Sequence, residues 1–213
     1  MNISITLILV IGTGIISFLA FNNEKTKNDL IFYPPAINRG QVYRFITHGF
    51  IHGDTFHLIF NLIALYSFGE NVEAMFSHPA IFAEKGRLFY IILYFSALII
   101  ASVPDYIKHR NDYYFRSLGA SGAVSAVIFS SILFNPNGGI GFAFLPGLDI
   151  PGYIFGAIYI IASTIMAKKG QDNIGHTAHI TGAFYGLIFT FVMTKLFTEI
   201  DVLDLFWRQV TGG

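Results

Sequence analysis

Four side chains in this sequence have the types and spacing needed for nucleophilic catalysis. Ser121 lies between Ala120 and Gly122, His179 comes much later in the chain, and His57 precedes Asn61 by four positions. A serine hydroxyl becomes a nucleophile when a neutral imidazole within hydrogen-bond reach removes its proton. Helical residues four positions apart share one face, so an imidazole N–H and an amide NH2 could together stabilise an oxyanion. This combination favours a serine–histidine dyad.

The elements that would position these residues are long apolar segments. A bilayer core of about 30 Å is crossed by about 20 helical residues. Six segments approach that length, at about 3–21, 57–77, 87–103, 119–134, 152–167 and 177–198. The fourth and fifth are short, and short segments are usually surrounded by protein rather than lipid. We therefore expect an all-α, polytopic bundle with these two segments at its centre.

The composition supports a membrane protein and excludes several other classes. Hydrophobic residues make up 54% of the chain and charged residues 12%, and the mean hydropathy is +0.58. A soluble domain of this length would leave large apolar patches exposed. A formal net charge of zero argues against nucleic-acid binding, and the absence of cysteine excludes disulfides and thiolate metal sites. The apolar run 3–21 lacks a positively charged start and a cleavage site, so we interpret it as a retained transmembrane helix.

Alternation of the six segments would bring the candidate residues together. The second, fourth and sixth segments would run in the same direction, so their amino-terminal ends would emerge on one side of the membrane. Gly182 and Gly186 form a small-residue face that begins three residues after His179. Close packing of that face would bring His179 to Ser121. The facing small residues on the fourth segment would be Gly122, Ala123 and Ala126.

Three motifs in this order resemble those of the rhomboid intramembrane serine proteases. Gly119–Ala123 is similar to the family's GxSG nucleophile motif, and Ala178–Gly182 followed by Gly186 resembles its AHxxGxxxG histidine motif. His57–Asn61 is similar to the HxxxN segment, with His52 in the place of an upstream histidine. Each fragment alone is weak, but all three at the heads of alternate segments form a strong signal.

The resemblance covers most of the chain and implies a single six-helix rhomboid-like domain over residues 1–213. It implies a serine endopeptidase that hydrolyses peptide bonds in or near transmembrane segments of other membrane proteins. Its partners would be those substrates and the lipid bilayer, with no cofactor and no metal. The implied catalytic residues are Ser121 and His179, the oxyanion-stabilising residues Asn61, His57 and Gly119 with the Ser121 backbone N–H, and the supporting residues His52, Gly122, Gly182 and Gly186.

One departure from the family pattern affects the expected site. Ser125 stands where many members have a tyrosine that packs on the catalytic imidazole, so another group would have to orient His179. This departure keeps open an alternative, namely a catalytically inactive relative that binds or escorts membrane proteins. A transporter with shallow histidines is a third reading, although such proteins usually distribute polar groups along a path across the membrane. His176, one turn before His179, is an alternative base.

Two signals disagree about membrane orientation. Counting basic residues would place the site in the cytoplasm, whereas the resemblance implies the extracytoplasmic side of the cell (inner) membrane, which we favour. We also expect the polar, glycine-flanked loop 168–175 to move when substrate enters. The basic residues on the site's side are Lys25, Lys27, Arg39, Arg44, Lys108, Arg110, Arg116, Lys168 and Lys169, nine of thirteen.

Other polar residues receive structural interpretations. We expect Arg44 to pair within its loop or to reach lipid phosphate, and Glu73 to cap or pair at the end of the bundle opposite the site. His52 could equally shape its loop or support the site. Three further histidines are expected to lie at the membrane interface: His48, His78 and His109.

Overall fold

The computed structural model describes residues 3–142, 145–169 and 175–212, and the chain is mostly helical in these ranges. Most of the loop that we expect to move lies outside them. The six long helices are α1 (Ile5–Phe21), α5 (Thr55–Phe76), α6 (Gly86–His109), α7 (Ser121–Phe134), α8 (Gly152–Lys169) and α9 (His176–Phe197). The shorter elements are α2 (Glu24–Leu30), α3 (Pro34–Ile37), α4 (Arg44–Thr47), η1 (His48–Phe50), η2 (Ala83–Lys85), β1 (Gly139–Phe142), β2 (Leu145–Pro151) and α10 (Val202–Thr211).

Each of the six apolar segments expected from the sequence forms one long helix. Within the described ranges, two helical stretches are both long and apolar enough to cross a membrane, Ala83–His109 and α9. Helices α1 and α7 are apolar but shorter. A crossing by all six helices therefore remains a prediction.

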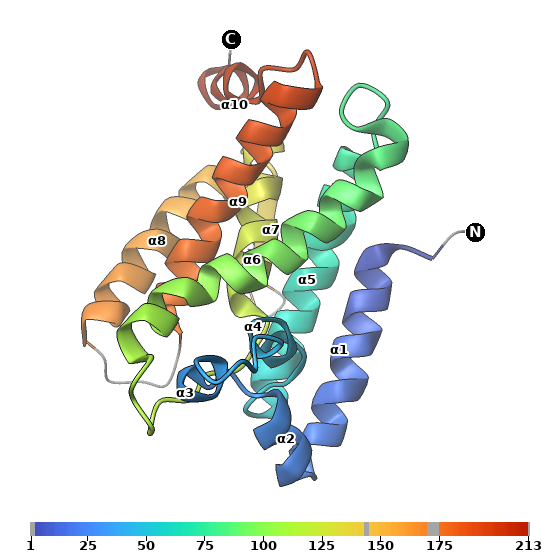
Figure 1. Cartoon of the computed structure of the whole chain (residues 1–213). Helices are drawn as coiled ribbons and strands as arrows, with labels where there is room; N and C mark the ends of the chain where they lie inside the picture. Colours follow the sequence, from blue (N-terminus) through green and yellow to red (C-terminus); the bar gives the residue numbers. More distant parts are fainter. Residues whose placement is uncertain (1–2, 143–144, 170–174, 213) are drawn as a thin grey trace.

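The helices alternate in direction as expected (Figure 1). Helices α5, α7 and α9 all begin at the lower end of the molecule, near α3 and α4, and run upward. Helix α10 and the carboxyl terminus lie at the opposite end. The starts of the three helices that carry the candidate residues are thus on the same side of the bundle.

Helix α7 is the centre of the bundle, whereas α8 is not. Twelve of the fourteen residues of α7 are buried. In α8 the buried residues are Gly152, Gly156 and Ser163, so the expectation that segment 152–167 lies at the centre was wrong. The physical reason is that α8 packs through only one face, where Gly156 approaches α7, and leaves large side chains such as Ile158 and Ile161 exposed.

Helices α7 and α9 pack backbone to backbone through the glycines of α9. A Cβ atom on Gly182 would lie 2.0 Å from the carbonyl oxygen of Gly122, and one on Gly186 would lie 2.1 Å from that of Ala126. Both separations are far below van der Waals contact, so no side chain fits at either position. The predicted small-residue interface is confirmed.

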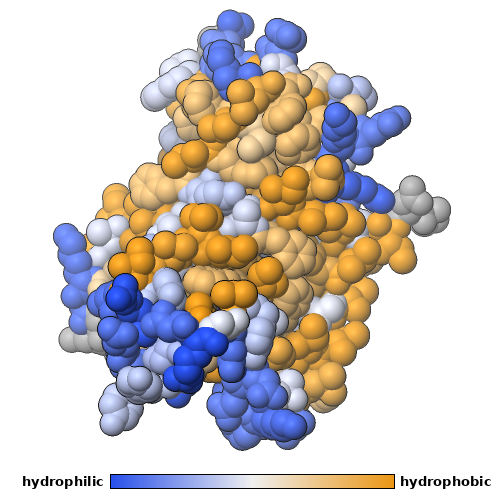
Figure 2. Space-filling view, viewed as in Figure 1, coloured by the Kyte–Doolittle hydropathy of each residue, from blue (hydrophilic) through white to orange (hydrophobic). Residues whose placement is uncertain are grey.

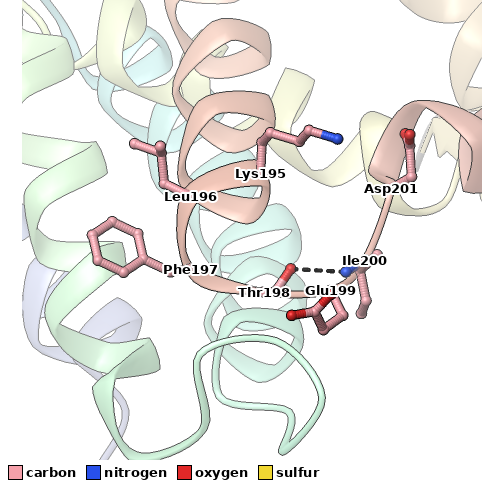
Figure 3. Close-up of a pocket in the computed structure, with 7 residues that line it drawn as sticks. All are labelled: Lys195, Leu196, Phe197, Thr198, Glu199, Ile200 and Asp201. Atoms are coloured by element: carbon pink, nitrogen blue, oxygen red, sulfur yellow. Dashed lines mark hydrogen bonds between the residues drawn. The ribbon is translucent and has the colours of Figure 1, made fainter.

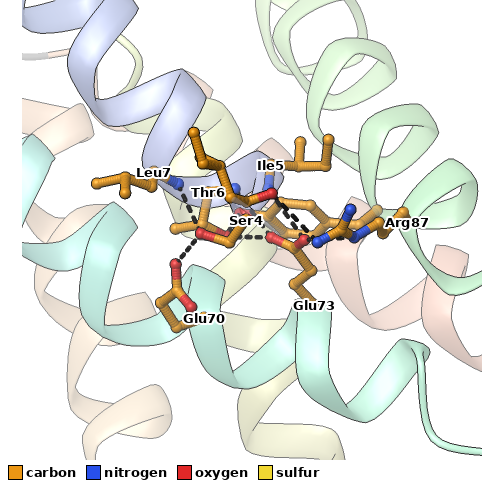
Figure 4. A network of polar contacts seen from close by, with 9 residues as sticks. Ser4, Ile5, Thr6, Leu7, Glu70, Glu73 and Arg87 are labelled. Carbon is orange, nitrogen blue, oxygen red and sulfur yellow. Dashed lines mark hydrogen bonds and ion pairs between the residues drawn. The ribbon is translucent and has the colours of Figure 1, made fainter. Parts of the chain in front are cut away.

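At the end of the bundle opposite the starts of α5, α7 and α9, Glu73 holds α1 against α5 (Figure 4). Its carboxylate accepts the backbone N–H groups of Ile5 and Thr6, both at 2.9 Å, and lies 3.4 Å from the Arg87 guanidinium. Because the first N–H groups of a helix have no partner within it, this buried carboxylate caps α1 from α5. The structural interpretation of Glu73 is confirmed, and it explains how α1 is attached.

A broad band of hydrophobic residues covers the middle of the face shown in Figure 2, with hydrophilic residues gathered toward its two ends. Exposed large apolar side chains come from the outward faces of several long helices. Examples are Ile15, Phe18, Phe60, Ile63, Ile161 and Ile188. Since exposed apolar area on this scale is unfavourable in water, the band is the surface that lipid would cover.

Helix α10 presents an apolar face at one end of this band. Asp201 caps its start by accepting the N–H groups of Leu203 and Asp204, and the Gln209 amide donates to the Phe134 carbonyl at 3.0 Å. Leu203 and Trp207, one turn apart, are exposed. This pattern is typical of a helix that lies in the membrane interface.

We expect Trp207, the single tryptophan of the chain, to lie at lipid headgroup depth. Its side chain is 61% exposed, so in lipid vesicles its fluorescence should be quenched by lipids brominated near the headgroup end of the acyl chain. A Trp207→Phe variant gives the background signal. Emission that is not quenched by the brominated lipid but is quenched by aqueous iodide would contradict this placement.

Candidate active site

The start of α5 is fixed by a capping carboxylate. Asp54 accepts the backbone N–H of His57 at 2.9 Å, which satisfies one of the first donors of the helix. Asn61 is buried one turn further along, and its amide donates one hydrogen to the His57 carbonyl at 2.9 Å. An amide NH2 carries two hydrogens, so one donor remains for a ligand.

The turn before α7 requires glycine at position 119. Gly119 has φ +114°, a left-handed conformation that other residues rarely adopt, and a Cβ there would lie 2.8 Å from the His57 ring. Its N–H donates to the His48 carbonyl at 2.9 Å. Gly119 therefore lies at the site as expected, but it contributes backbone shape and close contact rather than a free donor.

Ser121 is the first residue of α7. The cap residue, Ala120, has no side chain that could accept from the first turn, and the first hydrogen bond of the helix joins the Val124 N–H to the Ala120 carbonyl at 2.9 Å. The earliest N–H groups of a helix, including that of Ser121, have no acceptor within it and carry positive dipole character. This is suitable geometry for stabilising an oxyanion.

His52 connects this turn to α1. Its Nε2 accepts the Ala120 N–H at 3.4 Å, so in the neutral ring Nδ1 carries the proton and donates to the Ser17 hydroxyl at 2.9 Å. Ser17 in turn donates to the Phe50 carbonyl at 2.9 Å. The ring of His52 also meets that of His57 edge to face, at 4.9 Å between centroids. His52 therefore both shapes its loop and supports the turn before Ser121.

His48 is buried, so the expectation that it lies at the membrane interface was wrong. Its Nε2 is 3.1 Å from the Ser102 hydroxyl on α6, and its ring meets that of Phe32 edge to face at 5.3 Å. Ser102 is far away in sequence, and nothing local to His48 indicates that partner. His48 and His52 together form a buried pair of rings beneath the Gly119 turn.

The loop around the site is held by Arg44. Its guanidinium donates to the carbonyls of Asn28 and Ile31, at 2.8 and 2.7 Å, and to the Gln41 amide oxygen at 2.7 Å. Arg44 was expected either to pair within its loop or to reach lipid phosphate, and in the structure it pairs within the loop. These bonds hold the two halves of the first connection together.

His179 lies in the first turn of α9, beside the start of α7. A Cβ on Gly122 would lie 3.4 Å from the Ala178 carbonyl oxygen, so the residue after Ser121 and the residue before His179 are neighbours. The ring of Tyr159, from α8, lies over that of His179 with 6.0 Å between centroids and 29° between planes. The sequence pattern gave no indication of Tyr159.

Most of the candidate residues line one cavity of about 870 Å³. It is lined by residues from the first connection, from α5 and α6, from the turn before α7, and from the starts of α7 and α9. Among the described residues, His176 is not in its lining, which favours His179 over His176 as a base. The candidate residues that line the cavity are His57, Asn61, Gly119, Ser121, Gly122 and His179.

A second cavity, of about 570 Å³, lies at the turn between α9 and α10 (Figure 3). Seven consecutive residues, Lys195–Asp201, form all of it, so it is the inside of a bend in the chain. A hydrogen bond from the Ile200 N–H to the Thr198 hydroxyl, at 3.1 Å, shapes that bend. Because no groups from different elements converge there, it is not a candidate for catalysis.

The two buried histidines predict how stability depends on pH. Burial lowers the pKa of His48 to about 4 and, with a smaller effect of neighbouring His57, that of His52 to about 3. Below about pH 6.5 the unfolded chain binds protons that the folded chain does not, so the free energy of unfolding should fall as pH drops from about 6.5 to about 4. The limiting slope is about 1.4 kcal/mol per pH unit for each ring.

Thermal unfolding in detergent across this pH range measures the effect. A His48→Gln variant should show a shallower fall than the wild type, because one of the two rings no longer titrates. His78 is exposed, so His78→Gln serves as the control and should leave the fall unchanged. An equal slope in all three proteins would contradict the assignment of neutral, buried rings.

The fold is a helical bundle with a broad exposed apolar band, and its candidate site residues gather at the starts of three parallel helices. This is the pattern of a helical integral membrane protein. The sequence model of the Rhomboid domain matches residues 39–196, which is most of the chain. The chain belongs to the rhomboid family.

Several relatives share this family. "RHOMBOID-like protein 12, mitochondrial" of Arabidopsis thaliana is 25% identical over 185 residues, which cover 83% of this chain and 54% of the relative. The human "Presenilin-associated rhomboid-like protein, mitochondrial" is 27% identical over 168 residues, 77% of this chain and 42% of the relative. "Rhomboid protease GlpG" of Haemophilus influenzae is 27% identical over 175 residues, 78% of each chain. The chain spans about half the length of the plant and mammalian relatives.

Proposed function

We propose that this protein is a serine endopeptidase that cleaves peptide bonds in or near the transmembrane segments of other membrane proteins. The observation that carries the proposal is that Ser121 and His179 line the same cavity from the first turns of adjacent helices. Membership of a family that includes a relative named as a protease adds support. Residues 1–213 act as a single unit in this proposal.

In the first chemical step, the Ser121 hydroxyl attacks the carbonyl carbon of the substrate peptide while His179 accepts its proton. The resulting oxyanion is stabilised by the Ser121 N–H, the second amide hydrogen of Asn61 and the His57 ring. The tetrahedral intermediate collapses when its C–N bond breaks, and the protonated His179 gives its proton to the leaving amine. An acyl group then remains on Ser121.

In the second step, His179 removes a proton from a water molecule, and the oxygen of that water attacks the acyl carbon. The bond to Ser121 breaks, His179 returns the proton to the serine oxygen, and the new carboxyl end of the substrate leaves. Each cycle consumes one peptide bond and one water molecule. The chain's own residues carry every proton in this scheme.

The cavity wall suits an apolar substrate segment. Phe56 and Phe60 lie one turn apart on α5, line the cavity and are 76% and 61% exposed. They form an aromatic edge between the polar site and the hydrophobic band. A transmembrane segment that unwinds locally could place apolar side chains against this edge while its backbone reaches Ser121.

The proposed function is tested by incubating the purified protein in detergent with a single-span model substrate. Wild type should release two defined fragments and should react with a fluorophosphonate probe, whereas Ser121→Ala should do neither. Ser131, on the same helix but outside the cavity lining, provides the matched control in a Ser131→Ala variant. Binding of uncut substrate by wild type and by Ser121→Ala alike would instead favour the escort function.

We place the protein in the cell (inner) membrane with its site on the extracytoplasmic side. Two of the relatives described above carry mitochondrial names, so the compartment is part of the proposal. Because α10 lies at the end of the molecule opposite the site, the proposed orientation predicts a cytoplasmic carboxyl terminus (Figure 1). A topology reporter fused after Gly213 checks this, and an extracytoplasmic signal would reverse the orientation.

A further inference from the structure

Tyr159 takes part in a chain of contacts that joins both proposed catalytic residues. Its ring lies over that of His179, and its hydroxyl is 2.6 Å from the Ser125 hydroxyl. Ser125 donates its single proton to the Ser121 carbonyl at 2.8 Å. The direction of the other bond follows, because Ser125 can then only accept from Tyr159. These contacts therefore link the His179 ring, through Tyr159 and Ser125, to the backbone of Ser121.

Several contacts fix the ring of Tyr159 from its own side. Phe155, one turn earlier on α8, lies 5.9 Å away between ring centroids, and Phe129 of α7 lies 5.7 Å away. Gly156 allows this approach, since a Cβ there would already lie 3.3 Å from the Phe129 ring. Helix α8 is mostly exposed, yet at this point it is held against α7.

The small side chain at position 125 is what admits the ring from α8. Ser125 is buried in α7, one helical turn after Ser121. A large side chain at position 125 would fill the space next to the nucleophile that the Tyr159 ring now enters. With serine instead, a phenol from α8 reaches in and is anchored by the serine hydroxyl. The group that faces the imidazole therefore comes from α8 rather than from α7.

We propose that Tyr159, anchored by Ser125, is the positioning residue for the His179 imidazole, an inference that rests on the proposed function. The flat ring limits rotation of the half-buried imidazole on its α8 side, so the nitrogen that accepts the Ser121 proton keeps its direction. Its face also lies beside the ring that becomes positively charged during the reaction, which is a favourable arrangement. Tyr159 touches the base and not the substrate.

Cleavage kinetics separate the two parts of this pair. Tyr159→Leu removes the ring and should lower kcat by about tenfold to a hundredfold, part of what a general base contributes, with KM nearly unchanged. Tyr159→Phe removes only the anchoring bond, whereas Ser125→Ala removes that bond and also the one to the Ser121 carbonyl. Both variants keep an aromatic ring at position 159 and should cause smaller losses than Tyr159→Leu. Because the bond that Tyr159→Phe removes is also lost in Ser125→Ala, the double variant should be no worse than Ser125→Ala alone. Additive losses, or equal losses of kcat from Leu and Phe at position 159, would overturn the proposal.

The control is Tyr153→Leu, which removes another tyrosine from α8 about two turns away. It should retain wild-type kcat and should match Tyr159→Leu in thermal unfolding. A loss of kcat in Tyr159→Leu that is accompanied by an equal loss in Tyr153→Leu would indicate a general effect on α8 and would overturn the proposal.

Ring geometry can also be measured without relying on activity. The C–H resonances of the His179 ring, assigned by comparison with His179→Ala, should show a ring-current shift that disappears in Tyr159→Leu and persists in Tyr159→Phe. Absence of this shift in wild type would overturn the proposal. If wild type shows the shift but neither cleaves nor reacts with the probe, the proposed function fails while the placement of Tyr159 over His179 is supported. If wild type cleaves and Tyr159→Leu cleaves equally well, the positioning role alone fails.

Discussion

His179→Ala is expected to reduce cleavage of a transmembrane substrate by about 10⁴-fold or more, as much as Ser121→Ala does. The reason is that nucleophile and base act as a unit: without the imidazole the hydroxyl keeps its proton, and without the hydroxyl the imidazole has nothing to activate. The double variant should therefore be no slower than either single variant. Residual activity would come from the oxyanion-stabilising groups alone.

The neighbouring histidine supplies the control for this experiment. His176 is buried one turn earlier on α9, with its ring 5.8 Å from that of His179, but it does not line the cavity. His176→Ala should thus retain cleavage within about an order of magnitude, while thermal unfolding reports any loss of packing. A large loss in His176→Ala together with an active His179→Ala would reverse the assignment of the base.

Gly182→Ala is expected to damage both stability and activity. The added Cβ would lie 2.0 Å from the Gly122 carbonyl oxygen and 2.8 Å from its carbonyl carbon, and neither backbone atom can rotate away. Helix α9 would have to move outward and would carry His179, one turn earlier, away from Ser121. Overpacking of this kind costs about 1–3 kcal/mol and sometimes more.

Thermal unfolding and cleavage rates of Gly182→Ala measure both effects. Gly12→Ala is the matched control, because Gly12 is also a helical glycine but has no atom within 4 Å of an added Cβ. That substitution should leave activity unchanged and should stabilise α1 slightly, since alanine favours helix. Wild-type cleavage by Gly182→Ala would show that α7 and α9 are not locked together as described.

Much of the helical framework could be predicted because its signal is local. Apolar runs of this length leave few alternatives to helices, and the predicted segments agree with the observed ones within a few residues at most ends. For example, segment 119–134 was expected and α7 is Ser121–Phe134. The glycine face of α9 was predictable too, because small residues four positions apart define one side of a helix.

Other features depend on contacts that the sequence does not display. The β1–β2 hairpin pairs Gly139 with Pro151 in the connection between segments 119–134 and 152–167, for which no structure was predicted from the sequence. Helix α8 has an apolar composition that fits either the centre or the outside of a bundle, and only packing decides between them. Tyr159 is one tyrosine among eleven, and its partner Ser125 lies on a different helix.

The attachments of α1 bear on where the smallest independently folding part of this chain begins. The family domain match starts at residue 39, after α1 has ended. Yet Ser17 accepts from His52 beneath the Gly119 turn, and the backbone N–H groups of Ile5 and Thr6 donate to the buried Glu73 carboxylate. Trimming the chain to residues 39–196 would remove these partners from the Glu73 carboxylate and from the His52 imidazole. Truncation studies should therefore keep the first helix, although it lies outside the range that the family model matches.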